Sequence, residues 1–174
     1  MADRNHTQTY RLTITAALMA LNIAMSSFGI PVPGGHLYLC DAVICLAALL
    51  LDPFHAFVVG GIGSFLGDLI FYPLPMFVSL VTHGLQAAVI SYISHQAPAR
   101  YRKAASGIAV AIGAVIMVTG YTLGKAFIYA TPEIAMIKLP YEIAQAGLGA
   151  VLAMVLCWNC GLHTLYVRLA GQTS

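Results

Sequence analysis

A lysine that follows two spaced glycines, in the stretch GYTLGKAFIY (residues 120–129), is the first feature of this sequence that could do chemistry. A phosphate-binding loop needs four residues between its glycines and a Ser or Thr after its lysine. Here three residues separate Gly120 from Gly124, and Ala126 follows Lys125. The spacing excludes a phosphate loop, so a lysine within such an apolar stretch needs another explanation.

Other polar side chains also lie in apolar stretches, and together with Lys125 they could bind a small molecule. Carboxylates accept hydrogen bonds, ammonium groups and amides donate them, and tyrosine rings stack on flat ligands. Helical spacing puts three pairs on common faces: Tyr121 with Lys125, His83 with Gln86, and Glu142 with Gln145. The predicted substrate-binding residues are Tyr38, Asp41, Asp68, His83, Gln86, Tyr121, Lys125, Glu142 and Gln145, with Tyr129 as a further aromatic side chain.

The composition indicates what kind of molecule must position these side chains. Of the 174 residues, 60% are hydrophobic and 8% are charged, and the mean hydropathy is +0.85. A soluble domain carries about 25% charged residues. We therefore expect an all-α membrane protein in contact with a lipid bilayer. The net charge of +2 is divided among termini and loops and does not indicate nucleic-acid binding.

The apolar stretches divide into six candidate transmembrane helices, since one span needs about 20 apolar residues. Their approximate bounds are 11–30, 37–51, 54–71, 76–94, 107–129 and 141–169. The connector at 130–140 carries a short amphipathic run of its own. The two halves show no self-similarity, so we predict one integral membrane domain, residues 1–174, without an internal repeat.

The basic residues predict the orientation of the six spans, because cytoplasmic loops are enriched in Lys and Arg. With a cytoplasmic N-terminus, the inner segments hold Arg4, Arg11, Arg100, Arg102, Lys103 and Arg168, and the outer segments hold Lys125 and Lys138. We therefore expect both termini in the cytoplasm. The charged candidates Asp41, Asp68, Lys125 and Glu142 then fall in the outer half, and His83 and Gln86 lie near the middle of the fourth span. This distribution predicts a pocket that opens outward. Charges snorkelling to water, or capping nearby backbone, would explain some of them equally well.

Small residues form a second pattern, since small-xxx-small faces let membrane helices approach closely. Ala16, Ala20 and Ala24 recur every four residues in the first span. This stripe could pack within the bundle or dock another membrane protein. The glycines between Gly60 and Gly67 in the third span are expected to pack within the bundle.

Two rival functions stay open at this point. A membrane enzyme could use His83, Asp41 and Asp68, although the chain has no H-E-x-x-H and no G-x-S-x-G motif. A stand-alone secondary transporter would be expected to show inverted repeats. The C-x-x-C pair Cys157 and Cys160 is expected to lie within a helix as small apolar residues, so we predict no metal and no cofactor.

Taken together, several segments resemble the S component, the substrate-binding membrane subunit, of energy-coupling factor (ECF) vitamin transporters, in its riboflavin/hydroxymethylpyrimidine-type branch. They are GGHLYLCDAVICLAALLLDPFHAFVVGGIGSFLGDLIF (34–71), the Gly120–Tyr121 pair, Tyr129, LPYEIAQAGLGA (139–150) and the alanine stripe. Each is weak alone, but their order and spacing make the resemblance fairly specific. Family members often carry Asn in place of Glu142 and Lys in place of His83, which leaves the substrate open.

The resemblance implies a six-helix subunit in a bacterial or archaeal cell membrane that captures a vitamin or precursor. It would pair with a transmembrane coupling protein (T component) and two ATPase subunits, so no enzyme activity is expected in this chain. By analogy, Ala16, Ala20 and Ala24 would face the coupling protein, and the loop 31–38 would form part of a lid. Hydroxymethylpyrimidine or a pyridoxine-like vitamer suits the polar groups best, and riboflavin comes next.

Overall fold

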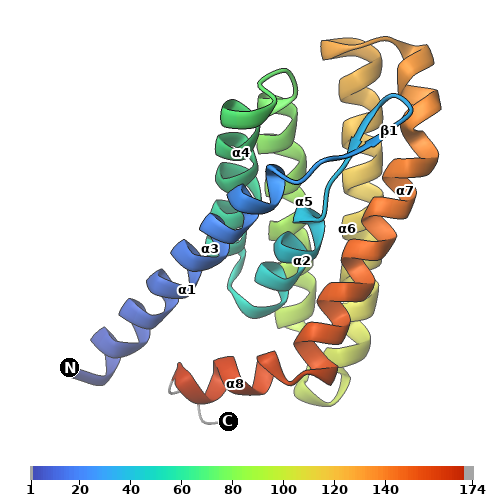
Figure 1. Ribbon diagram of the computed structural model, residues 1–174. Helices are drawn as coiled ribbons and strands as arrows, with labels where there is room; N and C mark the ends of the chain where they lie inside the picture. The colour runs from blue at the N-terminus through green and yellow to red at the C-terminus, as the bar shows by residue number, and fades with distance from the viewer. Residues whose placement is uncertain (1, 171–174) are drawn as a thin grey trace.

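The computed structural model describes residues 2–170, with side chains from residue 7, and within that range it is a bundle of helices with one small hairpin (Figure 1). The α-helices are α1 (Ala2–Ser26), α2 (Cys40–Leu50), α3 (Pro53–Phe57), α4 (Gly63–Phe71), α5 (Met76–Gln96), α6 (Arg102–Gly124), α7 (Pro132–Met154) and α8 (Leu162–Leu169). The strands are β1 (Ile30–Val32) and β2 (Gly35–Leu37). Short π-helical turns at Val58–Ile62, Lys125–Tyr129 and Val155–Asn159, and a 3-10 turn at Ala99–Tyr101, extend the helices.

Four helical segments of the described residues are long and apolar enough to cross a membrane. They are Pro53–Phe71, Met76–Gln96, Ala99–Tyr129 and Pro132–Asn159. These segments support the expected all-α membrane protein that crosses the bilayer several times. The full count of six crossings, and the side on which the termini lie, stay predictions. The start of α1 and the whole of α8 lie at the same end of the molecule (Figure 1).

Helix α2 lies at the centre of the bundle and is the helical part of the second predicted span, 37–51. At 11 residues and about 1.5 Å of rise per residue, it is too short to cross a bilayer by itself. Nearly all of its side chains are buried, and it packs against α1, α5 and α7. A helix that is apolar on every face is stable when other helices surround it, which is the position of α2.

The glycines between Gly60 and Gly67 pack inside the bundle, as predicted. A Cβ on Gly60 would lie 2.6 Å from the His83 carbonyl of α5, and one on Gly67 would lie 2.7 Å from Ser26 Oγ of α1. The π-helical turn at Val58–Ile62 also exposes a carbonyl, since Asn22 Nδ2 donates to Val59 O at 2.8 Å. This contact ties α1 to the third predicted span.

The predicted end of the first span and the predicted start of the second span were wrong. Helix α1 ends at Ser26 rather than near residue 30, and α2 begins at Cys40 rather than 37. Between them lies the antiparallel β1–β2 hairpin, in which Val32 pairs with Gly35. Pro33 and Gly34 form its turn, and Gly34 has φ +84°, a conformation that favours glycine. The Pro/Gly loop therefore has a defined structure that helical periodicity could not reveal.

The predicted last span, 141–169, was wrong at both ends. The connector is the first part of α7, which begins at Pro132 after the Thr131 cap, whose Oγ1 accepts from Ile134 N at 3.4 Å. Proline is favoured at a first helical position, and Pro140 is accommodated within the helix. At the other end Gly161 (φ +75°) separates the π-helical turn from α8. Cys157 and Cys160 therefore lie at a helix end, not within a continuous helix.

Candidate functional site

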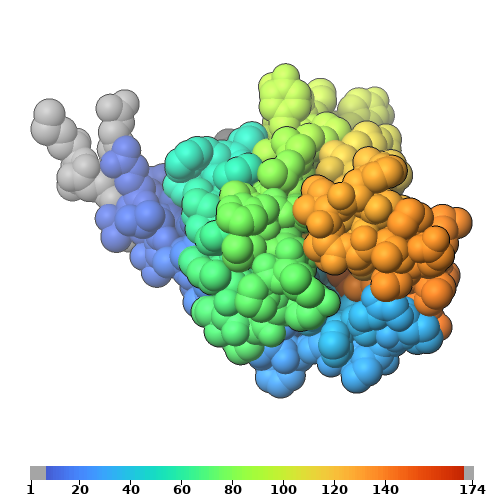
Figure 2. Space-filling view, turned by 90° about the horizontal axis from the view of Figure 1, so that it is seen from above, coloured from blue at the N-terminus to red at the C-terminus, as the bar shows by residue number. Residues whose placement is uncertain are grey.

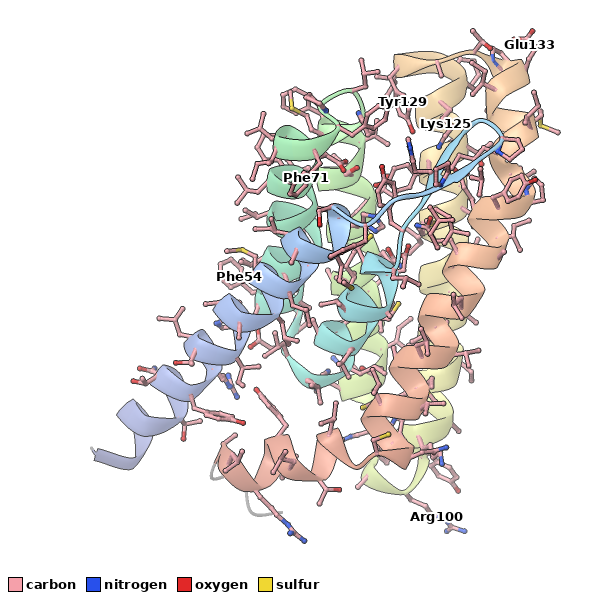
Figure 3. All side chains as sticks on the ribbon, viewed as in Figure 1. Phe54, Phe71, Arg100, Lys125, Tyr129 and Glu133 are labelled. Atoms are coloured by element: carbon pink, nitrogen blue, oxygen red, sulfur yellow. The ribbon has the colours of Figure 1, made fainter. Side chains whose placement is uncertain are left out.

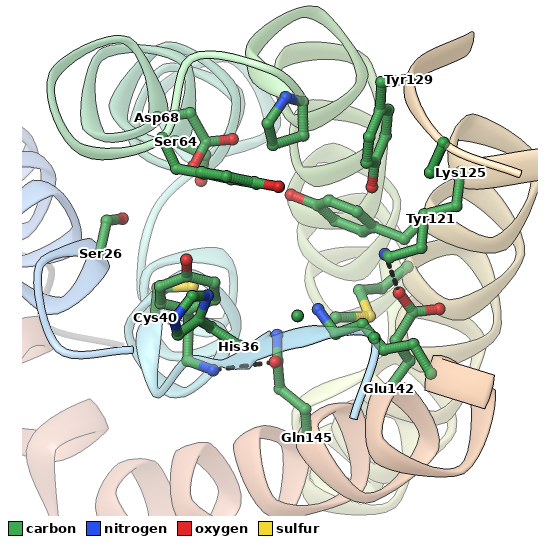
Figure 4. A pocket seen from close by; sticks show the side chains of 18 of the residues that line it. Ser26, His36, Cys40, Ser64, Asp68, Tyr121, Lys125, Tyr129, Glu142 and Gln145 are labelled. Atoms are coloured by element: carbon green, nitrogen blue, oxygen red, sulfur yellow. Dashed lines mark hydrogen bonds and ion pairs between the residues drawn. The ribbon is translucent and has the colours of Figure 1, made fainter. Parts of the chain in front are cut away.

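A cavity of about 400 Å³ opens at the end of the bundle that carries the hairpin (Figure 4). The hairpin, the start of α2, and helices α4, α5, α6 and α7 all contribute to its lining. Seven of the nine residues predicted to bind substrate line it: Tyr38, Asp68, His83, Tyr121, Lys125, Glu142 and Gln145. The other two, Asp41 and Gln86, lie in the buried layer beneath. The sequence therefore located the cavity, although no ligand contact follows from position alone.

Lys125 and Glu142 form an ion pair in the wall of this cavity, drawn as a dashed line in Figure 4. The two residues are 4% and 1% exposed, which excludes the alternative that they snorkel to water. Thr122 Oγ1 donates to the second oxygen of Glu142 at 3.2 Å. The ammonium lies 5.1 Å from the ring centre of Tyr121 and 5.5 Å from that of Tyr129, within cation–π range. Lys125 therefore has a carboxylate partner within the bundle.

A buried hydrogen-bond network forms the floor of the cavity around Asp41. Gln145 Nε2 donates to one oxygen of Asp41 at 2.6 Å, and Gln86 Nε2 donates to the other at 3.1 Å. Gln86 Oε1 lies 2.7 Å from His83 Nδ1, and because an amide oxygen only accepts, Nδ1 carries the proton. The predicted His83–Gln86 pair is confirmed. The network fixes the side chains that the cavity exposes.

A chain of hydrogen-bonding groups links Asp68, Ser79 and Tyr121 on another side of the cavity. Ser79 Oγ donates to Asp68, and Ser79 Oγ is also within hydrogen-bond distance of the Tyr121 hydroxyl. This chain joins α4, α5 and α6 at one height. It presents the Asp68 carboxylate and the Tyr121 hydroxyl to a bound molecule, and Tyr121 lies beside Lys125 (Figure 4).

The hairpin covers part of the cavity, and Tyr38 follows it. Gln145 Oε1 accepts from Tyr38 N at 2.9 Å, which fastens this segment to α7. Burial, and after it the negative charge of Asp68, raise the pKa of Tyr38 to about 12. The Tyr38 hydroxyl therefore stays protonated and can donate to a ligand at neutral pH.

Three potential metal ligands lie together at the cavity floor. Donor atoms of Cys40, Asp41 and His83 are within 4.8 Å of one another. The two Asp41 oxygens already accept from amides, and His83 Nδ1 already donates to Gln86. The Asp41 oxygens and His83 Nδ1 therefore have hydrogen-bond partners in the protein, and the absence of a metal stays a prediction.

Sequence reasoning missed several residues of the lining. Ser79, which supports the lining through its contacts with Asp68 and Tyr121, was not singled out, because a serine in an apolar helix carries little signal alone. His36 and the glycines of the turn belong to the hairpin, which was expected only as a loop. Lys138 was noted as a basic residue of the connector, whereas it lies on α7 and faces the cavity. A helical interpretation of 132–141 would have placed it one turn from Glu142.

The alanine stripe lies on the free side of α1. Ala16, Ala20 and Ala24 are exposed, whereas Thr15, Asn22 and Ser26 face the bundle. The stripe therefore does not pack within this chain.

The fold and site define a class of protein: a helical membrane protein that crosses the bilayer several times and holds a closed-bottomed polar pocket at one end. The sequence matches the model of the ECF-type riboflavin transporter S component family over residues 6–161. The chain belongs to this family, as its residues indicated. It is also 29% identical over 135 residues to an uncharacterized protein in the gap 3′ region of Pyrococcus woesei, which covers 76% of this chain and 88% of that protein.

Proposed function

We propose that this chain captures a small heteroaromatic vitamin or vitamin precursor in the cavity and delivers it to an ECF-type importer. Hydroxymethylpyrimidine or a pyridoxine-like vitamer is our first choice of substrate, and riboflavin is the second. Transport would be driven by two ATPase subunits through a transmembrane coupling protein. The membership of the family supports the general role, and the chemistry of the cavity supports the choice of substrate.

The buried Lys125–Glu142 pair is the observation on which the proposal depends most. A desolvated ion pair is a poor way to stabilise a fold, because apolar replacements are often at least as stable. Its place in the wall of a cavity, between two tyrosine faces, indicates a binding role. Glu142 can accept from ring amino or hydroxyl groups, and Tyr121 and Tyr129 can contact the flat ring.

The size of the cavity agrees with a small ligand. Small-molecule pockets measure about 300–1,000 Å³, and this cavity of about 400 Å³ is near the lower limit. A single-ring vitamer leaves room for waters or substituents, whereas riboflavin would need most of the space. This comparison favours the single-ring substrates.

The proposed orientation places the cavity outside and the basic end of the bundle in the cytoplasm. Arg100 lies at the end opposite Lys125, Tyr129 and Glu133 (Figure 3). In this orientation all six predicted spans would cross the cell membrane and both termini would be cytoplasmic. The exposed stripe Ala16, Ala20 and Ala24 would dock the coupling protein.

Substitution of Glu142 tests the binding site. Purified Glu142→Gln should bind the preferred probe among hydroxymethylpyrimidine, pyridoxine and riboflavin at least about tenfold more weakly, because a charge-assisted hydrogen bond is lost. The protein should stay folded, since the Gln oxygen still accepts from Lys125. Titration calorimetry measures the affinity, and Glu133→Gln, an exposed change at the same end, is the control. Wild-type affinity in Glu142→Gln would show that the site is misplaced.

Substitution of Ala20 tests the docking surface separately. Ala20→Trp adds a large side chain to the exposed stripe, far from the cavity lining. Binding by the purified protein should be unchanged, whereas uptake by cells that express the importer should be lost. Normal uptake would contradict docking through this stripe, and uptake in cells without the ATPase subunits would instead favour a secondary transporter.

A further inference from the structure

Lys138 lies in the cavity wall one turn before Glu142, beneath the turn of the hairpin. It is 8% exposed although lysine side chains usually extend to water. A Cβ on Gly34 would lie 3.1 Å from Lys138 Cβ, and one on Gly35 would lie 3.5 Å from Lys138 Nζ. The turn of the hairpin therefore covers the whole length of the side chain. Seen from the cavity end, the hairpin (light blue) abuts the first part of α7 (orange) in Figure 2.

The ammonium group of Lys138 has no hydrogen-bond or ion-pair partner in the part of the chain that the structure describes. Among the described residues, no hydrogen bond or ion pair involves Lys138, whereas Lys125 pairs with Glu142. The carboxylates of the lining have other contacts: Glu142 pairs with Lys125, and Asp68 accepts from Ser79 and attracts Lys138 without forming an ion pair with it. A buried charge without a partner is unfavourable, so such a group in a binding cavity usually meets a charge on the ligand.

We propose that Lys138 binds an anionic group of the ligand, a carboxylate or a phosphate, beneath the β1–β2 hairpin. The inference rests on the proposed function and narrows it: within the proposed class of heteroaromatic vitamins and precursors, it selects acidic members, such as phosphate esters, over the neutral molecules. A neutral carbonyl would accept a hydrogen bond from Lys138 but would leave its charge uncompensated. An anion accepts the hydrogen bond and also compensates the charge, and both interactions are strong in a site from which water is largely excluded.

The rest of the cavity gives this acidic group a fixed direction. The tyrosines beside Lys125 and Glu142 would hold the flat ring, and the acidic substituent would extend from it toward the hairpin. The bound anion would then join α7 to the hairpin turn through Lys138. The substrate class is therefore a small heteroaromatic ring with a carboxylate or phosphate ester substituent.

Matched pairs of probes test this inference. The neutral members are pyridoxine, hydroxymethylpyrimidine and riboflavin; the phosphorylated members are their phosphate esters; and 4-pyridoxic acid supplies a carboxylate. Titration calorimetry with the purified full chain should show that at least one anionic member binds about tenfold or more tightly than its neutral partner. A preference for 4-pyridoxic acid would assign a carboxylate, and a preference for an ester would assign a phosphate.

Variants of Lys138 connect this preference to the side chain. Lys138→Gln should abolish the preference for the anionic member, so that the two members of a pair bind with similar affinity. Lys138→Arg should keep most of it, and Lys103→Gln, an exposed lysine at the other end, should behave as wild type. A preference that survives in Lys138→Gln would overturn the inference.

The outcomes also separate this inference from the proposed function. If neutral members bind and no anionic member binds more tightly, the proposed function stands and the inference about Lys138 is wrong. If no probe of either kind binds, the proposed substrate class is itself wrong, and the inference falls with it.

Discussion

The two ends of this molecule each carry a carboxylate beside basic side chains, and the two groups differ in burial. At the cavity end, Glu142 and Lys125 are almost fully buried. At the opposite end, Asp52 pairs with Arg11 at 3.6 Å and with His55 at 2.7 Å, and the side chains of Asp52 and Arg11 are 35% and 36% exposed. The same chemical groups thus occur in two different environments.

The environment determines what each group can do. Asp52 caps α3, since its Oδ1 accepts from His55 N at 3.3 Å, and water screens its charges. This is a structural role that an exposed pair performs at little cost. The Lys125–Glu142 pair caps nothing and faces a cavity. Burial of a charged pair in a cavity wall is therefore a better indicator of a binding site in this chain than charge alone.

Removal of one cation from each group should give the largest difference between the two ends. Lys125→Met leaves Glu142 buried without its partner and should lower the free energy of unfolding by about 3–5 kcal/mol. Arg11→Met should cost less than about 1 kcal/mol, because the pair is exposed. Thermal unfolding in detergent measures both. Adding Glu142→Gln to Lys125→Met should recover part of the loss, and equal losses for the two single variants would contradict the comparison.

Two glycines of α7 give a smaller contrast between the cavity floor and the free face of the helix. A Cβ on Gly149 would lie 2.5 Å from Asp41 Cβ, with backbone atoms of α2 also close, whereas one on Gly147 meets nothing within 4 Å. Gly149→Ala should therefore destabilise the protein by about 1–3 kcal/mol and weaken binding. Gly147→Ala should be neutral or slightly stabilising. Unfolding and probe titration of both variants check this, and similar behaviour would show that α2 and α7 do not pack as described.

Much of the fold could be predicted because membrane helices have strong compositional signals. The third and fourth predicted spans agree closely with Pro53–Phe71 and Met76–Gln96. The hairpin could not be predicted from periodicity, since its strands have three residues each. The start of α7 was missed because a proline-containing connector suggested a loop, whereas Pro132 begins a helix and Pro140 lies inside it.

The candidate site was predictable to the extent that charge in an apolar stretch is rare. Asp41, Lys125 and Glu142 stood out for that reason, and the structure brings them to one end of the bundle. The hydrogen bonds of Asp41 to Gln86 and Gln145 depend on helix packing across 45 and 104 residues of sequence. No local pattern encodes such contacts, so the division into cavity lining and supporting floor needed the structure.

The smallest expected effect is the contribution of Asp52 to the free energy of unfolding, which depends on pH. Burial alone would raise the pKa of Asp52, but the hydrogen bonds and charge of His55, with Arg11, lower it below the ordinary value of 3.8. A carboxyl group with a lowered folded-state pKa stabilises the fold above its ordinary pKa, and that contribution is lost as the pH falls through the folded value. At neutral pH, Asp52→Asn should therefore lower the free energy of unfolding by less than about 1 kcal/mol, because the group is partly exposed.

Thermal unfolding of wild type and Asp52→Asn between neutral pH and about pH 3 measures this effect. The difference between the two proteins should be constant at neutral pH and should shrink below pH 3.8. Probe binding should not change, because Asp52 lies at the end opposite the cavity. A difference that grew on acidification would mean that the folded protein raises the pKa of Asp52. That result would remove the contrast between a screened capping group at this end and the buried pair at the other.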